Sequence, residues 1–178
     1  MGPTEINGLP AHALLVHVVV VLVPLAALLV VLSALWPAAR RRLGVLTPLC
    51  ALVAVVSVPL TTHAGEWLEA RVPADPLVRR HAELGDQLLP WAGGLFVIAA
   101  FGWYWSRRAD GLAGAPAAGG GAHATARGGV TAMTAVLAVL AIVIAVGSVV
   151  QIYRIGDSGA KAVWHDSVTS QPRAGAGG

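Results

Sequence analysis

Residues 13–36 read ALLVHVVVVLVPLAALLVVLSALW, and this stretch decides the fold. It holds no Asp, Glu, Lys or Arg, and about 20 mostly apolar residues are enough for an α-helix to cross the hydrocarbon core of a bilayer. Three further stretches have the same character. The sequence therefore predicts an all-α fold, a bundle of four transmembrane helices with short loops. The expected spans are about 13–36, 43–63, 83–105 and 130–152.

The composition also indicates a membrane protein. Hydrophobic residues make up 56% of the chain and charged residues only 12%, whereas about 25% of the residues of soluble proteins are charged. So few charges cannot cover the surface of a water-soluble domain, and lipid is therefore expected to cover most of it. The single cysteine, Cys50, excludes an intrachain disulfide and a cysteine-based metal motif.

One membrane domain is expected over residues 1–165. Within it, residues 109–129 are rich in Gly and Ala, which is typical of a flexible linker, here on the cytoplasmic side. Residues 166–178 are expected to form a disordered tail. No Lys or Arg precedes the first span, so we interpret it as a retained helix rather than a cleaved signal peptide.

The first span gives the orientation. The Lys and Arg residues divide evenly between the two sides of a four-span weave, so their total does not decide it. Nothing basic precedes the first span, whereas Arg40, Arg41 and Arg42 follow it. We therefore expect both termini outside the plasma (inner) membrane, with these arginines, Arg107 and Arg108 in the cytoplasm. The net charge of +3 then reflects contact with anionic lipid rather than with nucleic acid.

Histidines lie near those ends of the spans that share the predicted outer face: His12, His17, His63, His81 and His165. His17 lies between two valines, where an ionisable group is costly and usually faces the bundle interior. Three interpretations remain open for it. It is a structural imidazole bonded to a neighbouring helix, a ligand of haem or a metal, or a proton relay or contact to a polar ligand.

The turn between the second and third helices places carboxylates level with histidines. Counted from a turn near Ala74, His63 lies level with Asp86, and His81 lies level with Glu66. Packed helices stand about 8–10 Å apart, so both are expected pairs. A carboxylate that orients an imidazole is common around metal and haem ligands. Alternatively, both histidines are ordinary interfacial residues and the carboxylates are solvated helix ends.

Short motifs accompany these histidines. Residues 11–19 read AHALLVHVV, residues 62–68 read THAGEWL, and residues 80–85 read RHAELG. In this order they resemble a bacterial membrane family catalogued as domain of unknown function 2231 (DUF2231). The first helix of that family opens with His-Pro-x-x-Val-His-Phe-Pro. Here the two histidines keep their spacing but both prolines are absent. The resemblance covers nearly all of residues 6–165 and implies four helices, without implying an activity.

The end of the fourth helix departs from the family pattern. Many members show Gly-His-x-Gly-Ala/Gly followed by an aromatic residue. Residues 156–160 read GDSGA here, with Trp164 beyond them, so Asp157 stands where His is frequent. Asp157 and Trp164 are therefore weaker candidates for the site, together with His12.

The expected function is that of a small integral membrane protein with a His-lined polar site near its outer face. Haem needs one or two axial imidazoles, and helix bundles commonly supply them. A b-type haem or a transition metal that serves electron transfer would be held by His17 with His63 or His81. Glu66 and Asp86 would orient these ligands.

The alternative is a non-enzymatic accessory or structural subunit, in which the histidines hold helix ends together. Its partner would be a respiratory or other membrane complex, or a second copy of the chain. A transporter fits less well, because no charged residue lies deep in any span. A stand-alone enzyme is not expected, because no nucleophile and base form a recognisable pair.

Overall fold

The computed structural model describes residues 4–6, 8–113 and 122–165. The tail predicted over residues 166–178 lies outside this part of the chain. The same holds for residues 114–121, in the middle of the predicted linker.

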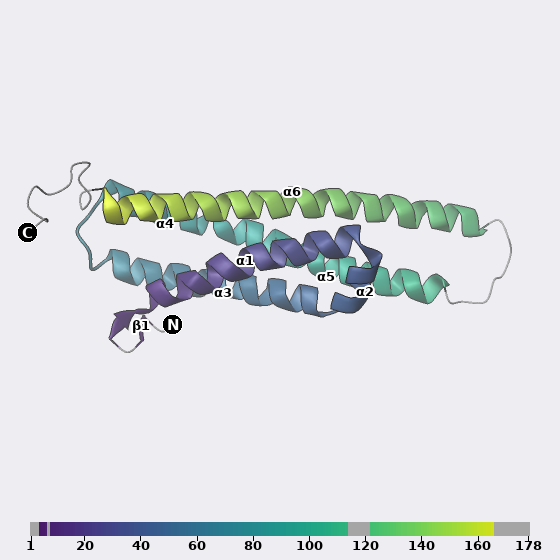
Figure 1. The fold of residues 1–178 in the computed structure, drawn as a ribbon, viewed down its shortest axis with the longest axis horizontal. Coiled ribbons are helices and arrows are strands. Elements are labelled where there is room, and N and C mark those ends of the chain that lie inside the picture. Colours follow the sequence, from purple (N-terminus) through teal and green to yellow (C-terminus); the bar gives the residue numbers. More distant parts are fainter. Residues whose placement is uncertain (1–3, 7, 114–121, 166–178) are drawn as a thin grey trace, which may run out of the picture.

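Within the described residues, a two-stranded ribbon precedes six helices (Figure 1). The ribbon pairs β1 (Glu5–Ile6) with β2 (Leu9–Pro10) in antiparallel fashion. The helices are α1 (Ala11–Leu35), α2 (Pro37–Leu43), α3 (Leu46–Glu69), α4 (Pro76–Asp86), α5 (Leu88–Ala113) and α6 (Ala122–Trp164). The long helices α1, α3, α5 and α6 lie along one another, which confirms the predicted all-α bundle.

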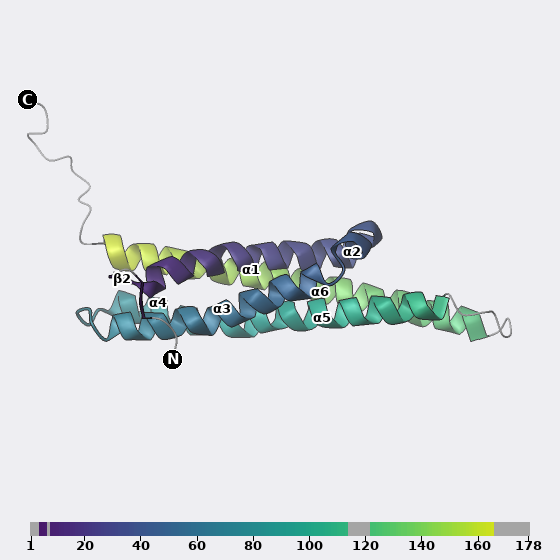
Figure 2. The same ribbon diagram turned by 90° about the horizontal axis from the view of Figure 1, so that it is seen from below.

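Each long helix packs mainly against two others (Figures 1 and 2). Both α1 and α5 contact α3 and α6, so α1 and α5 lie diagonally across the bundle. The core between them consists mostly of alanine and valine: Val19, Val23, Ala26, Ala27, Val30, Ala51, Ala54, Val58, Ala92, Ala99, Ala141 and Ala145. Small side chains let the backbones of neighbouring helices approach closely, which is the usual way in which membrane helices pack.

Many larger apolar side chains point away from the bundle. Val21 and Val97 are each 63% exposed, and Val139 is 61% exposed. Apolar surface on this scale requires a covering of lipid. Four segments are long and apolar enough to cross a membrane: Ala11–Leu35, Leu46–Glu69, Pro76–Ala109 and Ala132–Trp164. The protein is a multi-pass membrane protein.

The third of these segments is built from two helices. α4 and α5 meet at Gln87, three residues before Pro90. A proline has no N–H, so Pro90 cannot bond the carbonyl of Asp86. At its other end α4 begins at an N-cap, because Asp75 Oδ1 accepts a hydrogen bond from the backbone N–H of Leu77 at 2.7 Å.

Two short elements were not predicted from the sequence. The ribbon turns at Gly8, whose φ of 76° lies in the region that glycine tolerates best. The backbone N–H of Ala11 donates to the carbonyl of Thr4 at 2.9 Å, which ties the ribbon to the start of α1. The other element is α2, which follows α1 directly and carries the three consecutive arginines. Segments this short leave little periodic signal in a sequence.

α6 extends beyond the predicted fourth span at both ends. It has 43 residues, which corresponds to roughly 65 Å at the rise of an α-helix. α5 likewise continues to Ala113, so both ends of the predicted 109–129 linker are helical. The C-terminal extension of α6 matters most, because it brings Ile155, Ser158 and Gly159 against α4.

Gly147→Ala is expected to destabilise the bundle. A Cβ at Gly147 would lie 1.9 Å from Cζ3 of Trp91 on α5, and overpacking of this kind costs about 1–3 kcal/mol. Gly156 lies on the same helix with nothing within 4 Å of such a Cβ. Gly156→Ala is therefore the matched control, and it should stabilise α6 by up to about 1 kcal/mol. Thermal unfolding in detergent should show a lower midpoint for Gly147→Ala alone, and equal midpoints would contradict the contact.

Candidate functional site

The start of α1, the end of α3, α4 and the end of α6 meet at one end of the bundle (Figure 1). We call this the histidine end. It encloses a cavity of about 580 Å³, which is within the usual range for small-ligand sites. The polar and charged side chains that line it are His12, Thr62, Glu66, Glu69, Asp75, His81 and Asp86.

His12 connects α1 to α3. Its Nδ1 lies 3.0 Å from the carbonyl oxygen of Thr61. Gly65 is one turn further along α3, and a Cβ there would lie 3.0 Å from Nδ1 of His12. The absence of a side chain at Gly65 therefore gives the imidazole room to lie against the backbone of α3.

His81 connects α4 to α6 in the same way. Its Nδ1 lies 3.1 Å from the carbonyl oxygen of Ile155 and 3.1 Å from Oγ of Ser158. Gly159 is one turn after Ile155, and a Cβ there would lie 3.0 Å from Cε1 of His81. α4 has a further bond to α6, because the Gln151 side-chain amide donates to the carbonyl of Leu84 at 2.7 Å.

These contacts fix which ring nitrogen carries the proton. A carbonyl oxygen only accepts hydrogen bonds, so Nδ1 of His12 donates to Thr61. The hydroxyl of Ser158 donates to the carbonyl of Ile155 at 2.8 Å, so its oxygen also accepts from His81. In the neutral state both rings then carry their hydrogen on Nδ1 and a lone pair on Nε2. Neither Nε2 is hydrogen-bonded to any residue that the structure describes.

The two imidazoles lie close together in the cavity. Their ring centroids are 6.3 Å apart and the ring planes are nearly perpendicular, at 87°. Four carboxylates share the same cavity, from Glu66, Glu69, Asp75 and Asp86, and no Lys or Arg is among the described lining residues. A cavity of this composition attracts cations and repels anions.

The structure places the predicted site residues in two groups. His81, Glu66 and Asp86 border the cavity together with His12. His17 does not: its exposed ring bonds to its own helix, with Nδ1 at 2.6 Å from the carbonyl oxygen of Ala13. His17 and His81 therefore do not face each other in the structure.

The predicted pairs of histidine with carboxylate are not formed among the described residues. His63 lies near Glu66 on the same helix, with Nδ1 and Oε2 at 3.7 Å, rather than near Asp86. No ion pair joins His81 to Glu66. Among the weaker candidates, Asp157 accepts from Nζ of Lys161 at 2.7 Å, and Trp164 is exposed and outside the cavity lining.

Sequence reasoning ranked His12 low and did not single out Gly65 or Gly159. A glycine inside a helix costs about 1 kcal/mol relative to alanine, so it needs a structural reason. Gly65 lies four residues after Thr61, and Gly159 lies four residues after Ile155. Thr61 and Ile155 are the residues whose carbonyl oxygens accept from the two imidazoles. The sequence signal was therefore the glycine itself, inside a helical stretch at the histidine end, whereas the carbonyl beside it that meets an imidazole is visible only in the structure.

Two imidazole nitrogens at the cavity, Nε2 of His12 and Nε2 of His81, carry lone pairs with which a ligand can interact. Among the described residues, no three His, Cys, Asp or Glu side chains are arranged to hold a metal ion. A cation bound by His12 and His81 would therefore complete its coordination with water, or with a neighbouring carboxylate that moves toward it.

His12→Ala is expected to lower stability more than His17→Ala. The first substitution removes the hydrogen bond between α1 and α3, and such a bond contributes about 0.5–1.5 kcal/mol. The second removes an exposed bond within one helix, and its effect should stay within about 0.5 kcal/mol. Unfolding of both variants in detergent measures the difference. The opposite order would contradict the assignment of His12 as the interhelical residue.

The comparisons with known proteins agree with this architecture. No curated protein and no solved structure matches the chain. A family model described as a predicted membrane protein, DUF2231, matches residues 8–172. The match includes all four membrane-spanning segments and every residue of the cavity lining. The chain therefore belongs to the DUF2231 family of predicted membrane proteins.

Proposed function

We propose that the cavity at the histidine end binds a transition-metal cation through Nε2 of His12 and His81. One observation carries the proposal. Two imidazoles, each bonded through Nδ1 to a neighbouring helix, line a cavity that also contains carboxylates, and their ring centroids lie 6.3 Å apart. Histidines that bind metals commonly donate their other ring N–H to a backbone carbonyl or a carboxylate. Such a bond fixes the ring and leaves the lone pair of Nε2 for the ion.

The distance between the rings suits a single shared ion. A metal lies about 2.0–2.1 Å from an imidazole nitrogen, so ring centroids 6.3 Å apart leave room for one ion once both Nε2 atoms turn toward it. Imidazole suits copper, zinc and nickel, and affinity for divalent ions of this series is highest for Cu²⁺. Electron transfer, which the sequence suggested, would require a metal with two accessible oxidation states, such as copper.

A b-type haem fits this cavity less well than a metal ion does. Haem carries two propionate groups, which need cationic or hydrogen-bonding partners. The described lining offers four carboxylates and no Lys or Arg, so the propionates would face like charges. We therefore prefer a simple cation to haem as the ligand.

A second candidate is the accessory or structural subunit. The observation that favours it is the same pair of interhelical bonds, from His12 to Thr61 and from His81 to Ile155. These bonds stabilise the ends of four helices whether or not a metal is bound. The partner would then be a membrane complex or a second copy of the chain.

We further propose that the histidine end faces the outside of the plasma (inner) membrane. The three arginines on α2, and Arg107 and Arg108 near the end of α5, lie at the opposite end of the bundle (Figure 1). Because Lys and Arg are equally numerous on the two sides, the first span supplies the argument: nothing basic precedes it, and the three arginines of α2 follow it, which favours the cytoplasmic side for them. The cavity would then receive its cation from the external medium.

Substitution by asparagine separates the two candidate functions. Asparagine keeps an N–H donor near the position of Nδ1 but has no counterpart of Nε2. After treatment with a chelator, the wild-type protein in detergent should bind Cu²⁺ or Zn²⁺ with a stoichiometry of about one. His12→Asn and His81→Asn should each weaken binding by about 100-fold or more. His17→Asn and His63→Asn are the matched controls and should leave it unchanged.

The result is measured by titration calorimetry and by elemental analysis of the same sample. If the wild-type protein binds neither ion, the metal site is refuted, and the accessory or structural subunit is the remaining candidate function. Equal losses in all four variants would show that surface histidines bind the ion without the cavity.

Labelling from outside the cell tests the orientation. In a Cys50→Ala background, Ala74→Cys introduces a thiol at the histidine end, and Arg41→Cys introduces one at the opposite end. A maleimide that does not cross membranes should label the first variant in intact cells and the second only after permeabilisation. The reverse pattern would overturn the proposed orientation.

A further inference from the structure

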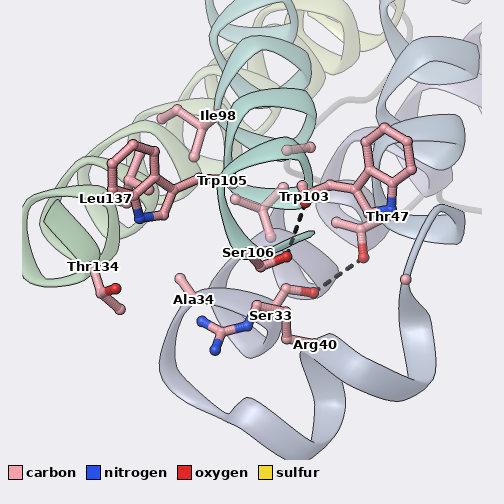
Figure 3. Close-up of a pocket in the computed structure, with 14 residues that line it drawn as sticks. Ser33, Ala34, Arg40, Thr47, Ile98, Trp103, Trp105, Ser106, Thr134 and Leu137 are labelled. Carbon is pink, nitrogen blue, oxygen red and sulfur yellow. Dashed lines mark hydrogen bonds between the residues drawn. The ribbon is translucent and has the colours of Figure 1, made fainter. Parts of the chain in front are cut away.

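The opposite end of the bundle contains a second, smaller pocket (Figure 3). We call this end of the bundle the arginine end. It consists of α2, the end of α5 and the N-terminal part of α6, whose side chains are described from residue 132 onward. The pocket has a volume of about 50 Å³, which is room for a few water-sized groups. Its polar lining residues are Ser33, Arg40, Thr47, Trp103, Trp105, Ser106 and Thr134.

Two residues that line this pocket carry buried hydrogen-bond donors without a described acceptor. The indole Nε1 atoms of Trp103 and Trp105 are buried, and neither has a partner among the described residues. Figure 3 shows the two indoles on opposite sides of α5, with Trp103 next to Thr47 and Trp105 next to Leu137. An indole nitrogen only donates, so each one needs an acceptor.

Arg40 adds a positive charge to these donors. Its guanidinium group lies at the pocket beside Ser33 and Ala34 (Figure 3). It forms no ion pair with any described residue, and no Asp or Glu is among the described lining residues. A guanidinium group presents five N–H donors in a planar fork that suits phosphate and carboxylate oxygens.

The hydroxyl groups that line the pocket add no negative charge. Ser106 Oγ donates to the carbonyl of Trp103 at 2.9 Å. Oγ of Ser33 and Oγ1 of Thr47 lie 3.1 Å apart and share one hydrogen bond. Buried donors without a partner are costly and rare in native proteins. The pocket therefore lacks an acceptor that carries negative charge.

We propose that the arginine-end pocket binds the phosphate group of an anionic phospholipid. The rest of the lining is aliphatic, including Val30, Ala34, Ile98 and Leu137. A cation and N–H donors next to aliphatic side chains match an amphiphile, whose phosphate lies at the membrane surface and whose glycerol and acyl carbons lie below it. This site is independent of the metal site proposed at the histidine end.

The surrounding charges favour lipid over free phosphate as the source of that group. Arg41 and Arg42 on α2, and Arg107 and Arg108 on α5, are exposed at the same end. Basic residues beside a span attract anionic headgroups by about 1 kcal/mol each. Such residues concentrate anionic lipid around the pocket, and Arg40 differs from its neighbours because it lines the pocket.

The test compares Arg40 with Arg41 in the full-length protein. Purified protein in a neutral detergent is titrated with phosphatidylglycerol or phosphatidylcholine, and native mass spectrometry counts the bound lipids. Wild type should bind phosphatidylglycerol at least about tenfold more tightly than phosphatidylcholine. Arg40→Ala should remove most of this preference, whereas Arg41→Ala removes the same charge outside the pocket and should change it less than about threefold.

Two indole variants keep the proposal testable if Arg40→Ala fails to fold. Trp103→Phe and Trp105→Phe keep an apolar ring but lose the N–H. The indoles lie on opposite sides of α5, so one phosphate should meet only one of them, and one of the two variants should weaken phosphatidylglycerol binding by about threefold to tenfold. Trp36→Phe is the control, because Trp36 is exposed outside the pocket lining, and it should have no effect. Equal losses for Arg40→Ala and Arg41→Ala would overturn the proposal. So would displacement of the lipid by inorganic phosphate alone, which would identify free phosphate as the ligand.

Discussion

The bond from an imidazole N–H to a carbonyl on the neighbouring helix is the interaction on which the histidine end depends. It occurs once between α1 and α3, through His12, and once between α4 and α6, through His81. In both contacts a glycine lies one turn after the carbonyl, where a Cβ would lie 3.0 Å from the ring and would push it away. A single arrangement therefore positions two rings, holds four helix ends together and leaves both Nε2 atoms for a ligand.

The bilayer imposes the complementary constraint on the rest of the bundle. Lipid is as apolar as the side chains, so the middle of the helices is held mainly by close packing of alanine, valine and glycine. Gly147 against Trp91 is the tightest such contact among the described glycines. The charged side chains of the described residues lie near the two ends. Carboxylates and histidines line the cavity at the histidine end, whereas Arg40 and two tryptophans line the pocket at the arginine end. These opposite compositions suit ligands of opposite charge.

The sequence predicted the fold well but placed the site only in part. Length and hydropathy located four spans, because these signals are local, but they did not show that the third span is divided into α4 and α5. The imidazole that lies next to His81, that of His12, was not predictable, because α1 is apolar on every side and its sequence does not show which face meets its neighbours. His17 was therefore favoured over His12. The pairing of His63 with Asp86 assumed that α4 lies mainly against α3, whereas α4 packs mainly against α6.

The central claim is that His12 and His81 carry their hydrogen on Nδ1 and present Nε2 to the cavity. Nitrogen NMR of the protein, labelled with ¹⁵N in its histidines and embedded in lipid nanodiscs, reports this directly, with His12→Asn and His81→Asn used for assignment. The account predicts a protonated Nδ1 and an unprotonated Nε2 for both rings in the neutral state. A hydrogen on Nε2 of either ring would contradict it, because the bonds to Thr61 and Ile155 would then lack their donor.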